Sequence, residues 1–144
     1  MATERTAEVT WQGDLLSGSG TIDRVGSGVL PVLGVSWASR AEEPDGRTSP
    51  EELIAAAWAS CFSMALSHGL AQSGNTAERL ETSATVTFQP GEGIIRGALT
   101  VRGVVPGLDN EGFLAAAREA KENCPVSKAL AGIPDVSLQA ELAS

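Results

Sequence analysis

The segment SPEELIAAAWASCFSMAL, residues 49–66, contains the clearest helix start in the chain and decides its fold class. Ser49 is a good N-cap, Pro50 suits the first helical position, and Glu52 stands where a capping box places its acidic residue. Residues 53–66 are apolar nearly all the way round the helix, a pattern typical of a helix that is buried on most sides. We therefore predict a long, buried central helix that stops near Gly74.

Strands are predicted on both sides of this helix, because apolar and polar residues alternate there between turn signals. In chain order, we expect a hairpin at residues 6–24, a strand at 29–37, a loop at 40–47, and strands at 80–88, 94–105 and 136–142. Asp109 should cap a helix at 110–123, and a short helix should cover 126–130. Hairpin-linked strands with single helices predict an α+β fold with a mainly antiparallel sheet.

The length of the chain and its net charge limit the number of domains and the kinds of partner that can be expected. A chain of 144 residues is the size of one domain, so we predict a single domain over residues 1–144. One core helix that is apolar all round is hard to cover in so small a chain, which suggests a second subunit. The formal net charge of −8 argues against nucleic acid as a partner.

The N-terminus and the apolar run predict the location. The first nine residues are polar and charged and lack the apolar core of a secretory signal. The apolar run at 53–66 is shorter than the roughly 20 residues that a membrane-spanning helix needs. We therefore expect a cytoplasmic protein without a membrane segment, whose thiols are kept reduced.

Two cysteines and one histidine are the candidate reactive groups. Cys61, Cys124 and His68 are too few and too loosely spaced for a metal site, so none is predicted. His68 lies seven residues after Cys61, about 10 Å along a helix, which is too far for a catalytic pair within it. Two cysteines in a reducing compartment are ordinarily inert core residues.

The surroundings of the cysteines allow a second interpretation. Cys124 precedes a predicted helix start, which lowers a thiol pKa, whereas burial of Cys61 in the apolar helix raises its pKa. As a nucleophile, Cys61 would need a cation brought to it. Arg40 and Arg47 flank the preceding loop, and Glu51 or its neighbour can orient either guanidinium. The pattern alone leaves core cysteines with a surface ion pair as an open alternative.

Two motifs give a more specific answer. Residues 48–62, TSPEELIAAAWASCF, closely resemble the first motif of the OsmC/Ohr family, the osmotically inducible and organic hydroperoxide resistance proteins. Residues 120–130, AKENCPVSKAL, resemble the second motif. Residues 11–14 and 105–109 are similar to the OsmC branch, and the resemblance runs from about residue 9 to 142.

The resemblance implies an intertwined homodimer with two active sites at the subunit interface. It also implies a peroxidase that reduces organic hydroperoxides to alcohols. Position by position, Cys61 matches the peroxidatic cysteine, Cys124 the resolving cysteine, Arg40 the thiolate-activating arginine and Glu51 the glutamate that holds it. No metal or organic cofactor is implied, and the reductant is a lipoyl-type dithiol or another small thiol.

Some residues depart from the family pattern or allow two roles. Ala41 replaces an aromatic residue that often follows the arginine, and Trp58 replaces a histidine common in the OsmC branch. Both changes bear on substrate preference. Trp58, Phe62 and Met64 either favour an apolar peroxide or simply belong to the core.

Two other functions stay open: a redox-sensing or stress-response protein with little turnover, and a stress-induced structural homodimer.

Overall fold

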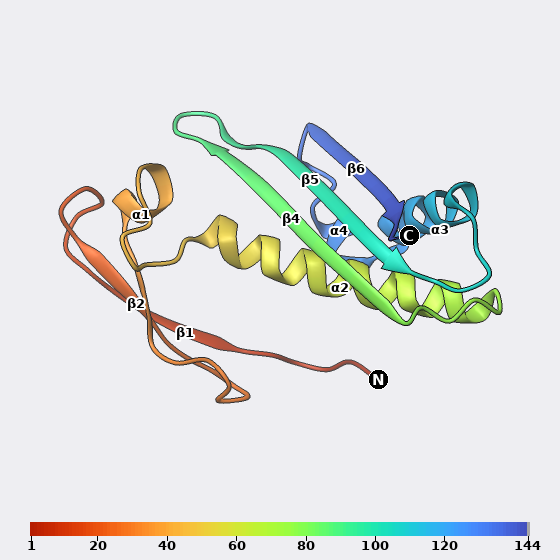
Figure 1. Cartoon of the computed structure of the whole chain (residues 1–144). Coiled ribbons are helices and arrows are strands. Elements are labelled where there is room, and N and C mark those ends of the chain that lie inside the picture. The colour runs from red at the N-terminus through yellow and green to blue at the C-terminus, as the bar shows by residue number, and fades with distance from the viewer. Residues whose placement is uncertain (144) are drawn as a thin grey trace. The chain divides into compact units, whose positions relative to one another are not determined.

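The computed structural model describes residues 1–143, and its contacts divide the chain into two compact units, residues 1–53 and the part from Ile54 onward. The long helix α2 (Pro50–Gln72) begins in the first unit and continues into the second (Figure 1). The prediction of a single domain over residues 1–144 stays a prediction.

The first unit is built on a small antiparallel sheet. Its strands β1 (Ala7–Gln12), β2 (Ser19–Val25) and β3 (Leu33–Val35) pair in that order. The predicted hairpin over residues 6–24 is confirmed. The predicted strand over residues 29–37 is too long, because the chain turns into a helix directly after β3.

That helix, α1 (Trp37–Ala41), was not predicted. Ser36 caps it: the Ser36 hydroxyl accepts the Ser39 N–H, and the Ser39 hydroxyl accepts the Ser36 N–H, both at 3.0 Å. This is a capping box with serine in place of the usual glutamate or glutamine. The expected loop over residues 40–47 is therefore wrong at its start, and Arg40 belongs to α1.

Helix α2 begins and ends where local chemistry predicts. Its first residue is Pro50, and the Ser49 hydroxyl accepts the Glu52 N–H at 3.1 Å. Beyond the other end, Gly74 has a φ of 83°, and the Asn75 N–H donates to the Leu70 carbonyl at 2.9 Å. A glycine in the left-handed region is the common way to end a helix.

The second unit contains a sheet of order β4-β5-β6. Strands β4 (Arg79–Gln89) and β5 (Gly93–Val104) form the predicted antiparallel hairpin. Strand β6 (Asp135–Leu142) pairs with β5 in parallel. A parallel pair needs a crossover connection, and α3 (Asn110–Asn123) with α4 (Pro125–Ala129) supplies it. The α+β class is confirmed, but residues 1–143 form two separate sheets, one of which includes a parallel pair.

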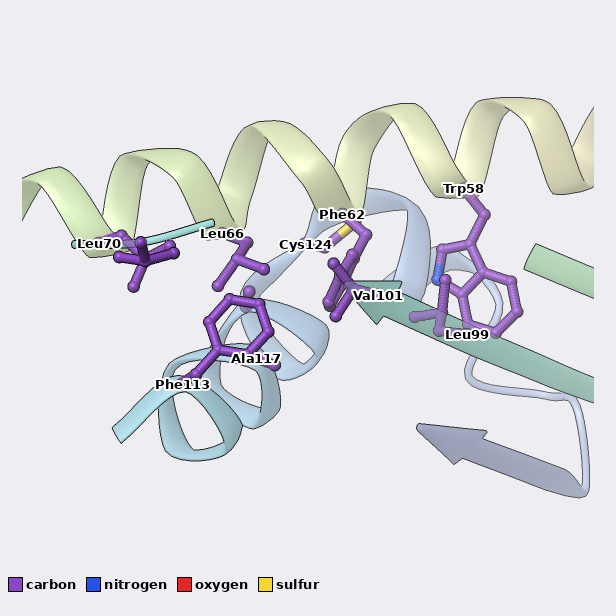
Figure 2. Packing of buried hydrophobic residues seen from close by; sticks show 11 residues of the cluster. Trp58, Phe62, Leu66, Leu70, Leu99, Val101, Phe113, Ala117 and Cys124 are labelled. Atoms are coloured by element: carbon purple, nitrogen blue, oxygen red, sulfur yellow. The ribbon is translucent and has the colours of Figure 1, made fainter. Parts of the chain in front are cut away.

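The core of the second unit lies along one face of α2. Four residues spaced four apart, which stack on one side of a helix, are at most 1% exposed. They are Trp58, Phe62, Leu66 and Leu70. Figure 2 shows these side chains projecting from α2 toward β5 and α3, where they meet Leu99, Val101, Phe113 and Ala117.

Most other residues of α2 are only partly buried or exposed. Met64, for example, is 72% exposed. By length and composition alone, α2 could cross a membrane, although the core helix of a soluble protein meets the same criterion. The sequence-based expectation that this segment is too short to span a membrane was wrong, because it counted only the 14-residue apolar run at 53–66. Helix α2 is 23 residues long.

Candidate active site

Arg40 and Glu51 form an ion pair in the first unit. Arg40 Nε donates to Glu51 Oε1 at 2.6 Å and to Oε2 at 3.2 Å. Glu51 is only 5% exposed, in the first turn of α2, so its carboxylate needs a partner. A buried carboxylate is tolerated when it is paired and hydrogen-bonded, and Arg40 meets that need.

Local hydrogen bonds hold α1 beside the start of α2. The Ser39 hydroxyl donates to the Thr48 carbonyl at 2.8 Å, and the Thr48 N–H donates to the Gly34 carbonyl at 2.9 Å. These bonds fix the helix that carries Arg40 against the residues that lead into α2. The orientation of the Arg40–Glu51 pair is therefore built into the backbone of this unit.

Arg47 was the alternative partner for the glutamates. Its side chain lies over β3, so close that a Cβ placed on Gly34 would come 3.2 Å from Arg47 Cγ. Glu51 instead pairs with Arg40, the arginine that the family resemblance singled out.

Cys61 and Cys124 are 63 positions apart in sequence, and the fold of the second unit brings them together. Each thiol is close enough to act as a hydrogen-bond partner that shifts the pKa of the other. Both are free thiols, Cys61 partly exposed and Cys124 fully buried. The four predicted site residues thus form two pairs, one in each unit.

Pro125 explains the placement of Cys124. A residue before proline avoids helical backbone angles, and Cys124 has φ −61° and ψ 122° between the end of α3 and the start of α4. Its N–H donates to the Ala120 carbonyl at 2.8 Å, and its own carbonyl accepts the Lys128 N–H at 3.1 Å. Cys124 therefore closes one helix and caps the next, which sets its thiol at the N-terminus of α4.

Opposite pKa shifts distinguish the two thiols. Burial raises the pKa of Cys61, and the neighbouring Cys124 adds to that effect. Burial acts in the same direction on Cys124, but hydrogen bonds from Cys61 and from the Ser127 N–H and hydroxyl outweigh it, so the pKa of Cys124 is lowered. In the isolated chain, Cys124 is thus the more readily ionised thiol, whereas the predicted roles require a thiolate at Cys61.

One hydrogen bond between α2 and α4 could not be predicted from the sequence. The Trp58 indole Nε1 donates to the Ser127 hydroxyl oxygen at 2.8 Å. Trp58 is 1% exposed, and a buried indole N–H almost always has an acceptor. That rule predicts some partner for Trp58, but a sequence cannot say that it is a residue 69 positions away. Trp58 and Phe62 are core residues here, whereas Met64 is exposed.

Two pockets of the second unit lie along the helices that carry the cysteines, and neither is lined by a cysteine. A pocket of about 280 Å³ lies beside Trp58 and Ser127 and is bordered by Lys121 and Lys128. His68 lines a different pocket, between α2 and α3. Within residues 1–143, no three His, Cys, Asp or Glu side chains group in a way that could hold a metal ion.

Comparison with known proteins points to one family. The family described as OsmC-like protein matches residues 43–139. A curated relative from Escherichia coli, named Peroxiredoxin OsmC, is 39% identical over 133 residues, which cover 90% of this chain and 92% of the relative.

Solved structures share the fold. The organic hydroperoxide resistance protein OhrB of Bacillus subtilis has a TM-score of 0.64 at 29% identity, covering 96% of this chain and 98% of that one. An OsmC-like protein from Mycoplasma pneumoniae has a TM-score of 0.69 at 13% identity, covering 96% and 98%. The second likeness concerns the fold alone.

Proposed function

This chain belongs to the OsmC family, and from that premise we propose that it is a thiol-dependent peroxidase that reduces organic hydroperoxides to alcohols. The names of its relatives support a peroxidase role in general. The name of the Bacillus protein refers to organic hydroperoxides. The observation that carries the proposal is the meeting of two free thiols, Cys61 and Cys124, from distant parts of the chain.

The first step oxidises Cys61. The thiolate of Cys61 attacks the distal peroxide oxygen, the O–O bond breaks, and the alkoxide leaves and takes up a proton to become the alcohol. Cys61 is left as a sulfenic acid. Partial exposure of Cys61 allows a peroxide to reach it, whereas Cys124 is fully enclosed.

The second step forms a disulfide. The thiolate of Cys124 attacks the Cys61 sulfur, the S–O bond breaks, and the departing oxygen leaves as water after protonation. A dithiol of the lipoyl type, or another small thiol, then supplies two electrons and returns both cysteines to thiols. The cycle uses no metal or bound organic cofactor, and we place it in the cytoplasm.

Arg40 is assigned to favour the thiolate of Cys61. Without a cation, burial raises the pKa of Cys61 and leaves too little thiolate at neutral pH. Arginine suits the role because it stays protonated and holds a carboxylate at the same time. The contact with Glu51 orients the guanidinium.

Helix geometry suggests that the cation comes from a second copy of the chain. Glu51 and Cys61 are ten residues apart on α2, which corresponds to about 15 Å of rise and about 80° of rotation. A glutamate side chain cannot span that distance. If two α2 helices cross antiparallel about a two-fold axis, the start of one lies beside the cysteine of the other.

The same crossing would cover the apolar surface that the single chain leaves open. Large apolar residues are exposed in both units, among them Val9, Leu16 and Val29 in the first and Met64 in the second. Exposed apolar residues in such numbers mark an interaction surface. Small residues such as Ala55, Ala56 and Ala57 let two α2 helices approach closely. We therefore propose a homodimer, and not a lipid bilayer, as the environment of α2.

A steady-state assay tests the peroxidase. We expect turnover of alkyl hydroperoxides with a lipoyl dithiol and slower turnover with a monothiol. After one equivalent of hydroperoxide, non-reducing peptide mapping should find Cys61 linked to Cys124 within one chain. Oxidation of the thiols without turnover would favour a redox sensor, and thiols inert to peroxide would favour a purely structural dimer.

A further inference from the structure

The hydrogen bond between Trp58 and Ser127 joins the middle of α2 to the start of α4 within the second unit. The indole N–H donates to the Ser127 hydroxyl oxygen at 2.8 Å, and the indole is almost fully buried. In Figure 2 the indole of Trp58 projects from α2 to the same side as Phe62. The bond is partly buried, so water competes with it less than with a bond at the exposed surface.

Ser127 also belongs to the surroundings of Cys124. Cys124 is the N-cap of α4, and Ser127 is the third residue of that helix. At this position both the backbone N–H and the side chain of a residue point back toward the N-cap residue, as in a capping box. The position of Ser127 on α4 brings its hydroxyl within reach of the N-cap residue, and hydrogen bonding to Ser127 is among the causes that lower the pKa of Cys124.

A serine hydroxyl has one hydrogen and two acceptor positions. Because the indole N–H of Trp58 occupies one acceptor position, the hydroxyl is turned and its hydrogen is directed to another acceptor. Cys124, three residues earlier at the N-cap of α4, is a neighbour that can accept this hydrogen as a thiolate.

We propose that Trp58 is a positioning residue: by donating to Ser127, it orients the Ser127 hydroxyl so that this group donates to the sulfur of Cys124. The hydrogen-bond network Trp58–Ser127–Cys124 can exist whether or not the protein is a peroxidase, but its role in turnover rests on the proposed function. In that role it favours the thiolate of Cys124 that attacks the Cys61 sulfenic acid. It also stabilises the electron pair that returns to Cys124 when a reductant breaks the disulfide.

A titration of Cys124 tests the network without any peroxide. In a Cys61→Ala background, Cys124 is the only thiol of the chain, and its ionisation is followed by ultraviolet absorbance of the thiolate. Ser127→Ala should move the midpoint to higher pH, and Ser127→Thr, which keeps a hydroxyl, should largely preserve it. Trp58→Phe should move the midpoint in the same direction by less.

A double-mutant cycle separates positioning from packing. Trp58→Phe should shift the midpoint when Ser127 is present and leave it unchanged in the Ser127→Ala protein. Its effect on unfolding in urea, by contrast, should persist in both backgrounds. If Trp58→Phe shifted the midpoint equally with and without Ser127, the proposal would be overturned. An unchanged midpoint in Ser127→Ala would also overturn it, and that result does not depend on how well Trp58→Phe folds.

Ser63→Ala is the matched control. The Ser63 hydroxyl is also partly buried, but it donates to the Thr82 hydroxyl at 2.7 Å, so its loss should not move the midpoint.

Kinetics then test the role in turnover. With both cysteines present, Ser127→Ala should slow disulfide formation after one equivalent of an alkyl hydroperoxide by about threefold per unit of pKa shift. A higher pKa leaves about tenfold less thiolate per unit, and the greater nucleophilicity of the more basic thiolate offsets part of that loss. A protein that consumes no peroxide would refute the proposed function, while the titration would still decide the network. A shifted midpoint with unchanged disulfide formation would confine the network to structure and refute its role in the reaction.

Discussion

Arg40 Nε lies 2.6 Å from Glu51 Oε1, which links the short helix α1 to the first turn of α2. The carboxylate is buried, whereas the Arg40 side chain is 32% exposed. The buried carboxylate fixes the orientation of a partly exposed guanidinium in the first unit. We assign this guanidinium to the thiolate of Cys61 in a partner subunit.

Arg40→Ala should slow the alkylation of Cys61 at neutral pH and move its pH profile upward. The sign follows from the physical causes: only the thiolate reacts, burial raises the pKa of Cys61, and Arg40→Ala removes the cation that we assign to oppose this effect. The measurement is the alkylation rate against pH in a Cys124→Ser background. Arg47→Ala is the control and should leave the profile in place, and a profile unchanged by Arg40→Ala would assign activation to another group.

The same substitution should lower stability. Glu51 would keep its buried place without its partner, and we expect a loss of about 2 kcal/mol in the free energy of unfolding, less than for a fully buried pair because Arg40 is partly exposed. Urea denaturation measures this, with alkylation rates compared only under conditions in which each variant is folded.

The two cysteines should separate the two half-reactions. Cys61→Ser should show no burst of peroxide consumption, because it lacks the attacking sulfur. Cys124→Ser should consume about one equivalent and then stop as a sulfenic acid, which a dimedone probe traps. Stopped-flow consumption and mass spectrometry check both. Wild-type rates in Cys61→Ser would show that the assigned chemistry is wrong.

Shared active sites predict complementation between inactive subunits. A Cys61→Ser protein and a Glu51→Ala protein, unfolded together and refolded, should recover activity in part of the heterodimers, since one kind of site then has an intact Cys61 and an intact Glu51. The heterodimers are verified by tags on each chain. No recovery would count against sites built from two subunits, and a stable active monomer in sedimentation would exclude the dimer.

Gly97→Ala should destabilise the second unit. Gly97 on β5 lies directly under the indole, and a Cβ there would come 2.8 Å from Trp58 Cζ3 and 2.9 Å from Cη2. Overpacking of this kind typically costs about 1–3 kcal/mol, which urea denaturation would detect. Gly132→Ala is the matched control, because nothing lies within 4 Å of a Cβ at that position. Equal stability of the two variants would mean that the indole moves aside at little cost.

Features that depend on neighbours in sequence were predicted well. The start of α2 at Pro50 follows from Ser49, and the start of α3 follows from Asp109, whose side chain accepts the Gly112 N–H at 2.8 Å. The hairpins follow from alternation and turn residues. The helix α1 was missed because its cap, Ser36 with Ser39, lacks the acidic residue that makes a capping box visible in a sequence.

The sequence by itself determined the α+β class, the helix that carries Cys61, the cysteine before Pro125 and the family to which these motifs point. Only the tertiary structure decided that Cys61 meets Cys124, that Glu51 holds Arg40 while Arg47 lies over Gly34, and that β6 runs parallel to β5. The physical reason is range. Caps and turns are set by hydrogen bonds within a few residues, whereas these pairings depend on how the apolar face of α2 and the α3–α4 crossover pack against a sheet.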